Sequence, residues 1–216
     1  MVTNWINKTT PKEEFDMGNI VAIVGRPNVG KSSLMNRILG QKVAIVSSKP
    51  QTTRTKILGV KTGEDYQLIM IDTPGIHKPH NKLSQRMEKY IYTATQDIDA
   101  LLYVVDCNIK DDELEAEKEA LEGLKTSDTP VILAINKIDK PAANPDKVKQ
   151  DLTEHGLLVE DWGGDVICVP VSAKTGEGIT NLLEMILLQA EMMDLKANPK
   201  ATPEGVIIES QLEQGR

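Results

Sequence analysis

The sequence is poor in aromatic residues, in cysteine and in long apolar runs. Aromatic side chains make up 3% of its 216 residues, with Phe15 as the single phenylalanine, so the core must be aliphatic. Two cysteines, Cys107 and Cys168, are too few for a disulfide framework or a cysteine metal cluster. No apolar run reaches the roughly 20 residues of a membrane span, and residues 1–18 contain no signal-peptide core. We therefore expect a cytoplasmic protein with ordinary buried thiols.

Positive charge is also scarce. The sequence carries 25 Lys and Arg against 32 Asp and Glu, a formal net charge of −7, which argues against holding nucleic acid by bulk charge. The length is that of one domain with tails. We expect residues 1–18 to be a flexible extension, residues 19–195 to form the domain, and residues 196–216 to be a linker with the truncated strand of a following domain.

Short apolar stretches alternate with amphipathic helical patterns along the chain. The strands are apolar throughout, which is typical of a parallel sheet covered on both faces. The pattern predicts an α/β fold with a mostly parallel six-stranded sheet in three α/β/α layers. The predicted strands are 19–24, 66–72, 101–106, 131–136 and 166–172, with two strand pieces, 42–46 and 57–61, around a polar loop. The predicted helices are 31–39, 83–94, 111–125, 146–155 and 179–190.

Residues 25–32 (GRPNVGKS) fit the phosphate-loop pattern GxxxxGK[ST] between a predicted strand and a predicted helix. Backbone N–H groups in such a loop face phosphates, and the following helix adds partial positive charge. Lys31 supplies a point charge for the β- and γ-phosphates, and the Ser32 hydroxyl is placed for magnesium. The candidate phosphate-binding residues are Gly25, Arg26, Pro27, Asn28, Val29, Gly30, Lys31, Ser32 and Ser33.

Residues 72–75 (DTPG) follow at the end of another buried strand. Asp72 is placed to hold magnesium through water, and the N–H of Gly75 can bond a γ-phosphate oxygen. Thr73 and Pro74 complete this second nucleotide-binding segment.

The polar stretch 50–54 (PQTTR) lies between these two motifs and is expected to contain a switch threonine. Such a threonine completes the magnesium site and senses the γ-phosphate. Thr53 is our choice and Thr52 is the alternative. The predicted catalytic residues are therefore Lys31, Thr53 and Gly75, and the predicted magnesium ligands are Ser32, Thr53 and Asp72.

Residues 136–139 (NKID) predict the base specificity. The Asp139 carboxylate can accept hydrogen bonds from N1–H and the 2-amino group of guanine, whereas adenine has neither donor. Sites of this kind discriminate by roughly 10⁴ or more. The Lys137 stem can lie along the base plane, and Asn136 can tie this loop to the phosphate loop.

Residues 172–174 (SAK) follow the last predicted strand. The N–H of Ala173 can meet guanine O6, with Ser172 and Lys174 beside it. Together the four motifs define a guanine-nucleotide domain of the P-loop NTPase fold.

In the usual strand order of that fold, 2-3-1-4-5-6, the fifth strand separates Cys107 from Cys168, so we expect no disulfide between them.

Two resemblances to known families follow from these motifs. Residues 19–105 resemble the G domain of bacterial Era, a GTPase of ribosomal small-subunit assembly, through VAIVGRPNVGKSSLMNRILGQKVAIVS, KPQTTRTKILGV and DTPGIHKP. Residues 131–216 resemble bacterial translation initiation factor two through AINKIDKPAANPDKV, EHGLLVEDWGGD and IIESQLEQGR. The chain thus resembles a mosaic of two related TRAFAC-class GTPases. No KH-like segment follows residue 180, so we do not expect direct RNA binding.

The resemblance implies hydrolysis of GTP to GDP and phosphate with Mg²⁺ and a ribosomal subunit as partner. It also implies that Asn28 can ligate K⁺. Ile76 stands where Ras-like enzymes carry a water-orienting Gln, and His77 beside it is a candidate substitute. Unassisted turnover is then expected on the order of 10⁻⁴ to 10⁻² per second. The alternatives are an initiation-factor G-domain fragment, a GTP/GDP switch with negligible hydrolysis, and a folded mosaic without a cellular role.

Overall fold

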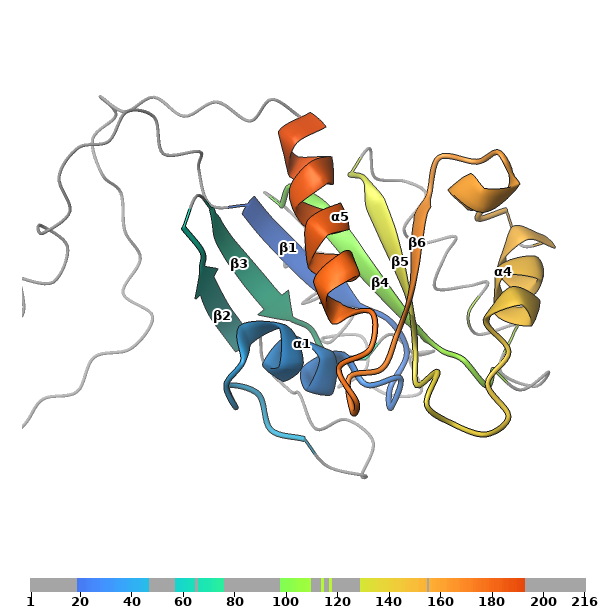
Figure 1. The fold of residues 1–216 in the computed structure, drawn as a ribbon, viewed down its shortest axis with the longest axis horizontal. Helices are drawn as coiled ribbons and strands as arrows, with labels where there is room; N and C mark the ends of the chain where they lie inside the picture. Colours follow the sequence, from blue (N-terminus) through green and yellow to red (C-terminus); the bar gives the residue numbers. More distant parts are fainter. Residues whose placement is uncertain are drawn as a thin grey trace, which may run out of the picture.

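The computed structural model describes residues 19–46, 57–64, 66–75, 98–109, 114, 117, 129–154 and 156–192. Its strands form one six-stranded sheet of order β2-β3-β1-β4-β5-β6 (Figure 1). The β2 strand is antiparallel to β3, and every other pair is parallel. This confirms the predicted fold class and strand order. The elements are β1 (Asn19–Val24), α1 (Lys31–Leu39), β2 (Ile57–Thr62), β3 (Gln67–Asp72), β4 (Ala100–Asp106), β5 (Val131–Asn136), α4 (Pro145–Glu154), the short 3-10 helix η1 (Glu160–Trp162), β6 (Ile167–Val171) and α5 (Ile179–Met192).

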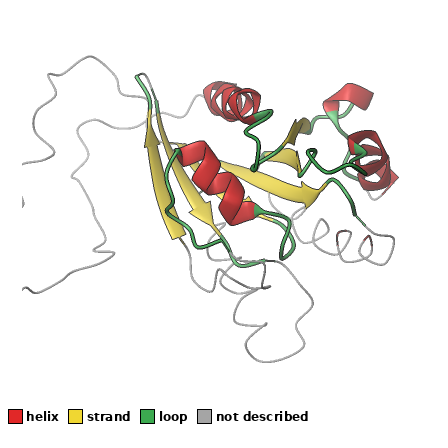
Figure 2. Cartoon of the chain, turned by 60° about the horizontal axis from the view of Figure 1, so that its bottom comes forward, coloured by secondary structure: helices red, strands yellow, loops and turns green. Residues whose placement is uncertain are grey.

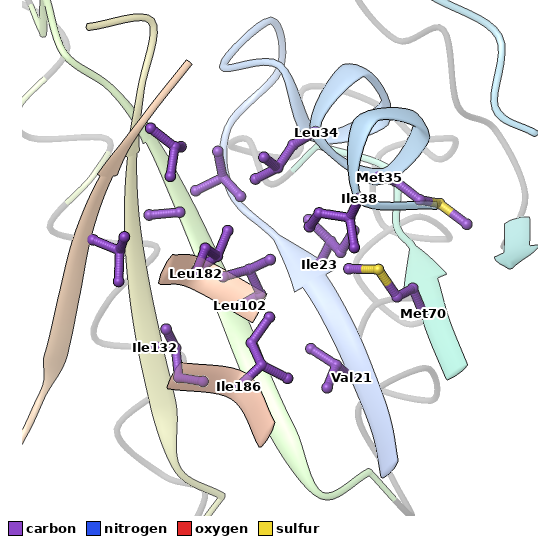
Figure 3. Close-up of a cluster of buried hydrophobic side chains, with 14 of the residues drawn as sticks. Val21, Ile23, Leu34, Met35, Ile38, Met70, Leu102, Ile132, Leu182 and Ile186 are labelled. Carbon is purple, nitrogen blue, oxygen red and sulfur yellow. The ribbon is translucent and has the colours of Figure 1, made fainter. Parts of the chain in front are cut away.

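Alternation along the central strands divides the core into two layers of packing. Successive strand residues point to opposite faces of a sheet. Val21 and Ile23 of β1 therefore join one cluster with α1 and α5, as Figure 3 shows. Ala22 and Val24 join a second cluster with Val148 and Leu152 of α4 on the other face. The sheet accordingly lies between helices, which Figure 2 shows from a second direction.

The register of the parallel strands gathers the motif-bearing loops at one end of the sheet. Ile23 in β1 pairs with Asp72 in β3, and Asp106 in β4 pairs with Asn136 in β5. Loops that follow the carboxyl ends of parallel strands form the ligand sites of open α/β sheets. In Figure 1 the loops that lead into α1 and α5 meet at this end of the sheet.

The strand predicted at 42–46 is wrong. These residues form a bent segment outside the sheet. The Oδ1 atom of Asn36 in α1 accepts hydrogen bonds from the N–H groups of Val43 and Ala44, both at 2.8 Å, and its Nδ2 atom donates to the Ala44 carbonyl at 2.8 Å. One side chain thus satisfies backbone groups that the prediction assigned to a strand ladder.

Some of the remaining predictions concern residues that the structure describes, and others concern residues that it does not describe. Cys107, which follows β4, and Cys168 in β6 are both free, and β5 lies between these two strands, as expected. No helix among the described residues is long and apolar enough to cross a membrane. Residues 1–18 and 196–216, the predicted helix at 83–94, and Thr52, Thr53, Ile76 and His77 lie outside the described residues.

Candidate functional site

The phosphate-loop segment curls between β1 and α1 through residues with positive φ. Gly25, Asn28 and Gly30 have φ values of 142°, 65° and 101°. A Cβ atom at Gly25 would lie 2.3 Å from the Val104 carbonyl oxygen, so the close approach to β4 requires glycine there. The residues between β1 and α1 therefore adopt the curled backbone that the motif predicts.

Lys31 is the first residue of α1 and is buried. Its ammonium donates hydrogen bonds to the carbonyl oxygens of Gly25 at 2.9 Å and Arg26 at 2.8 Å. Burial lowers the pKa of Lys31 to about 8, while the carboxylates of Asp72 and Glu117 act in the opposite direction. The loop thus holds a desolvated cation, which a bound anion would stabilise in its charged form.

Ser32 and Asp72 come together from α1 and β3. The Ser32 hydroxyl donates to Oδ2 of Asp72 at 2.5 Å, and Asp72 is fully buried. Hydroxyl and carboxylate oxygens are hard donors of the kind that magnesium prefers. The residues present therefore fit a magnesium ion, which Ser32 and Asp72 would hold, directly or through water.

The DTPG segment lies directly against the phosphate loop. A Cβ atom at Gly75 would be 2.6 Å from the backbone nitrogen of Pro27, so these two loops touch. The Thr73 hydroxyl donates to the Ile23 carbonyl of β1 at 2.7 Å and fixes the start of the segment. The structure thus brings Gly75 to the phosphate loop.

The NKID segment is tied to the phosphate loop from β5. The Nδ2 atom of Asn136 donates to the Val29 carbonyl at 2.9 Å, which confirms the predicted link between the loops. Lys137, with φ of 69°, sends its ammonium to the Asn28 carbonyl at 2.5 Å and to Asp106 at 2.6 Å. The Lys137 stem therefore crosses from one loop to the other.

Asp139 lines a cavity of about 510 Å³ whose other lining residues are Gly30, Ser33, Asn136, Lys137, Lys140, Ala173 and Lys174. The Ser172 hydroxyl donates to Oδ1 of Asp139 at 2.8 Å and holds the pKa of that carboxyl below its ordinary value. Lys174 approaches Oδ2 at 3.7 Å. The Ala173 N–H, expected to face guanine O6, donates to Oδ1 of Asn136 at 3.1 Å. The cavity thus presents an ionised carboxylate beside the phosphate loop.

Sequence reasoning missed two carboxylates that brace the site. Asp106 ends β4 and accepts hydrogen bonds from Lys137 and, at 3.3 Å, from Lys140. Burial acts to raise the pKa of Asp106, but the hydrogen bonds from Lys137 and the Asn108 N–H outweigh it and lower the pKa. The signal in the sequence was its place at the carboxyl end of a buried strand, where Asp72 and Asn136 also stand.

The second missed carboxylate is Glu117, which is fully buried. It accepts a hydrogen bond from the Tyr103 hydroxyl of β4 and pairs with Arg26 of the phosphate loop. Glu117 stands three residues after Leu114 and four before Leu121 in the sequence. That spacing puts it on the apolar face of the predicted helix, which was the available signal.

Comparison with known proteins places the chain in a class and then in a family. The fold and the site segments are those of a P-loop GTPase G domain. Residues 20–137 match the family described as 50S ribosome-binding GTPase, and the chain belongs to this family.

Curated relatives and solved structures agree on the class. The chain is 41% identical over 197 residues to translation initiation factor IF-2 of Clostridium botulinum (strain Langeland), covering 91% of the chain and 27% of the relative. It is 39% identical over 211 residues to IF-2 of Alkaliphilus oremlandii, covering 98% of the chain and 28% of the relative. The chain therefore spans just over a quarter of these relatives.

Two solved structures cover most of the chain. A crystal structure of Era with MgGDPNP and nucleotides of 16S ribosomal RNA matches with a TM-score of 0.67 and 33% identity, over 87% of this chain and 60% of Era. The G domain of the T. maritima FeoB iron transporter matches with a TM-score of 0.56 and 28% identity, over 81% of this chain and 99% of that domain. The G-domain fold is thus shared across relatives of different roles.

Proposed function

We propose that this chain binds GTP and GDP with Mg²⁺ and hydrolyses GTP to GDP and phosphate. The observation that carries the proposal is one juxtaposition at the carboxyl end of the sheet. The buried Lys31 ammonium and the Ser32–Asp72 pair lie at the phosphate loop, and Asp139 lines the adjoining cavity. A triphosphate with magnesium would bind at Lys31, Ser32 and Asp72, and the guanine base of the same nucleotide would bind at Asp139.

In the proposed reaction a water oxygen bonds to the γ-phosphorus, and the bond from that phosphorus to the β–γ bridging oxygen breaks. GDP and inorganic phosphate leave. Lys31, the backbone N–H groups of the phosphate loop other than at Pro27, and the N–H of Gly75 stabilise the charge on the phosphate oxygens. When bound, Mg²⁺ neutralises charge on the β- and γ-oxygens. Thr53 is proposed as its further ligand and as the γ-phosphate sensor.

The proposed guanine site consists of Asn136, Lys137, Asp139, Ser172, Ala173 and Lys174. The Asp139 carboxylate accepts hydrogen bonds from the guanine base, and the Lys137 stem lies along the plane of that base. For the base to reach the Ala173 N–H, that donor must be shared with or released from Asn136, because it donates to Asn136 at 3.1 Å. Arg26, Pro27, Asn28, Val29, Thr73 and Pro74 complete the proposed contacts.

Unassisted turnover is proposed to be slow, because the position after Gly75 is Ile76, which cannot orient water. We propose that K⁺, held in part by the amide oxygen of Asn28, supplies charge that an arginine supplies elsewhere. Asn28 is exposed at the phosphate loop with φ of 65°, which leaves its side chain accessible to an ion.

The test is single-turnover GTP hydrolysis with Mg²⁺ in potassium and then in sodium, beside GDP affinity. A rate several-fold higher in potassium, lost in Asn28→Ala, supports the full proposal. Equal rates in both salts overturn the role of K⁺ and leave the hydrolase. Tight GDP binding without hydrolysis in either salt favours a binding switch.

A ribosomal subunit is the proposed partner. The family description names 50S ribosome binding, and the matched Era structure contains 16S ribosomal RNA, which favours the small subunit. Era-like action in small-subunit assembly predicts that the chain co-sediments with 30S subunits in the presence of GMPPNP and is released by GDP. Binding to 50S subunits alone would contradict the small-subunit assignment.

The alternative is the G domain of an IF-2-type factor, which the identity of about 40% over nearly the whole chain favours. We also propose the mosaic, with an Era-like segment at 19–105 and an IF-2-like segment at 131–216. Both relatives align across both segments. Identity to each relative, measured over each segment separately, tests the mosaic: equal values in the two segments would contradict it.

A further inference from the structure

A charged network lies behind the phosphate loop, away from the cavity beside Asp139. Its centre is the carboxylate of Glu117, which is 0% exposed. Oε2 of Glu117 accepts a hydrogen bond from the Tyr103 hydroxyl, and Oε1 lies 3.4 Å from the Arg26 guanidinium. A buried carboxylate is costly unless it is paired and hydrogen-bonded, and these two groups provide both.

Tyr103 gives the network a fixed end. It is 0% exposed in the middle of β4, between Val24 of β1 and Leu133 of β5. Burial, together with the adjacent Glu117 carboxylate, raises the pKa of Tyr103 well above its ordinary value, so its hydroxyl remains a donor. Its position is therefore set by the sheet and not by the phosphate loop.

Arg26 connects the network to the proposed phosphate-binding cation. Its guanidinium pairs with Glu117, and its backbone carbonyl accepts a hydrogen bond from the Lys31 ammonium at 2.8 Å. The next residue, Pro27, is the one against which Gly75 packs. A displacement of Arg26 would thus move a carbonyl that holds Lys31 and the surface on which Gly75 lies.

We propose that Glu117 is a positioning residue for GTP hydrolysis, which anchors Arg26 to Tyr103 and thereby sets the place of Lys31. The inference rests on the proposed function, because it assigns a purpose to the placement of Lys31. The carboxylate also contributes charge: it acts to raise the pKa of Lys31 against the effect of burial. Glu117 itself acts only through Arg26 and Lys31.

The test compares Glu117→Gln, Tyr103→Phe, Arg26→Met and the double variant Arg26→Met/Glu117→Gln. Glu184→Gln, an exposed carboxylate on α5, is the matched control. Each protein is measured for GDP dissociation rate, for single-turnover hydrolysis with saturating GTP, and for unfolding temperature. Tyr103→Phe removes a single hydroxyl, and the Arg26 side chain is 19% exposed, so both variants should fold. They therefore test the inference even if Glu117→Gln unfolds.

We expect Glu117→Gln and Arg26→Met each to slow hydrolysis by about 10-fold, on the scale of a catalytic group displaced by less than 1 Å. Tyr103→Phe should slow it about 3-fold. The double variant should be no slower than either single variant, because both break one link. A merely structural Glu117 would lower the unfolding temperature and leave the rate of the folded protein unchanged.

The outcomes separate the inference from the proposed function. Rates within twofold of wild type in folded Glu117→Gln and Arg26→Met, or losses that multiply in the double variant, overturn the inference alone. Wild-type protein that binds GDP without hydrolysing GTP overturns the proposed hydrolase. GDP dissociation then decides whether Glu117 sets the place of Lys31: faster release in both single variants supports that placement, and unchanged release overturns it. Wild-type protein that binds neither nucleotide overturns both.

Discussion

At the scale of single residues, the site depends on backbone conformations that most side chains cannot adopt. Gly30 has φ of 101°, and a Cβ atom there would lie 2.4 Å from Nδ2 of Asn136, the atom that ties the NKID segment to the phosphate loop. Gly40, at the end of α1, also has positive φ, but nothing lies within 4 Å of its absent Cβ. A substitution at Gly40 therefore introduces backbone strain alone, whereas a substitution at Gly30 introduces strain and also disturbs the link between the loops.

We predict that Gly30→Ala weakens GDP binding by at least ~10-fold and that Gly40→Ala leaves it unchanged. Both variants should lose about 1–3 kcal/mol of unfolding free energy, because an alanine with positive φ is strained. Titration with a fluorescent GDP analogue and denaturant unfolding measure the two effects. Equal GDP affinity in the two variants would contradict the role given to the Asn136 link.

The sequence also shows which site residues can be predicted at this scale. Lys31, Ser32 and Asn136 occupy fixed places in short motifs, and in the structure they contact Arg26, Asp72 and Val29 at the carboxyl end of the sheet. Glu117 and Asp106 belong to no motif. Their roles depend on distant partners, Arg26 and Lys137, and such pairings arise only when the strands have been placed beside one another.

At the scale of elements, α1 determines the shape of the segment that follows it. The Asn36 amide makes three hydrogen bonds to the backbone of Val43 and Ala44. The apolar residues within 42–46 predict a strand when only this local stretch is considered. The prediction failed because the Asn36 side chain, seven to eight positions away, competes for the same backbone groups, and a local apolar pattern contains no sign of that competition.

We predict that Asn36→Ala lowers the free energy of unfolding by about 1–3 kcal/mol, because it removes these bonds from partly buried groups. Amide exchange at Val43 and Ala44 should accelerate more than exchange in β1. The control is Gln67→Ala, whose side chain makes an exposed 3.4 Å hydrogen bond to Thr62 and should change stability by less than ~0.5 kcal/mol. Unchanged exchange at Val43 would contradict the account.

The β6 strand carries a titratable group outside the candidate site. Burial raises the pKa of the Cys168 thiol to about 11, with Lys149 acting to lower it. A thiol whose pKa is higher in the folded than in the unfolded protein stays protonated longer when folded. Between the two pKa values the folded state binds more protons, so stability falls as pH rises.

We therefore predict that unfolding free energy declines from pH ~8.5 to about 11 more steeply in wild type than in Cys168→Val. Alkylation of the folded protein at pH 8 should also be slow at this thiol. Parallel pH profiles for the two proteins would refute the assignment. Lys149 titrates in the same alkaline range, where its hydrogen bond with Asp161 raises its pKa, and its interaction with the Cys168 thiolate is part of the difference that the comparison measures.

At the scale of the whole molecule, packing on both faces of the sheet holds the site-bearing ends of the strands in register. On one face α5 contributes Leu182 and Ile186 to the cluster that also includes residues of α1 and β1 (Figure 3). The strand order could be predicted because the motifs identify a fold with a known order. The helices at 83–94 and most of 111–125 stay predictions.

We predict that Ile186→Ala, at a side chain 1% exposed, lowers the unfolding free energy by about 2–5 kcal/mol through lost burial and a residual cavity. Leu188→Ala, two positions along the same helix and 45% exposed, should cost less than about 1 kcal/mol. Chemical denaturation gives both values. Similar costs would show that α5 does not pack in the core as described.

The most direct test of the central claim is the base preference of the whole chain, measured by titrating wild type and Asp139→Asn with GDP and with xanthosine diphosphate. Xanthine carries a carbonyl oxygen where guanine carries the 2-amino group, so an amide at position 139 can donate where the carboxylate accepts. The account predicts that wild type prefers GDP by about 10³-fold or more and that Asp139→Asn reverses the preference. The control Asp165→Asn, at an exposed carboxylate, should behave as wild type. Equal affinities of wild type for the two nucleotides, or no change in preference in Asp139→Asn, would contradict a guanine site at Asp139.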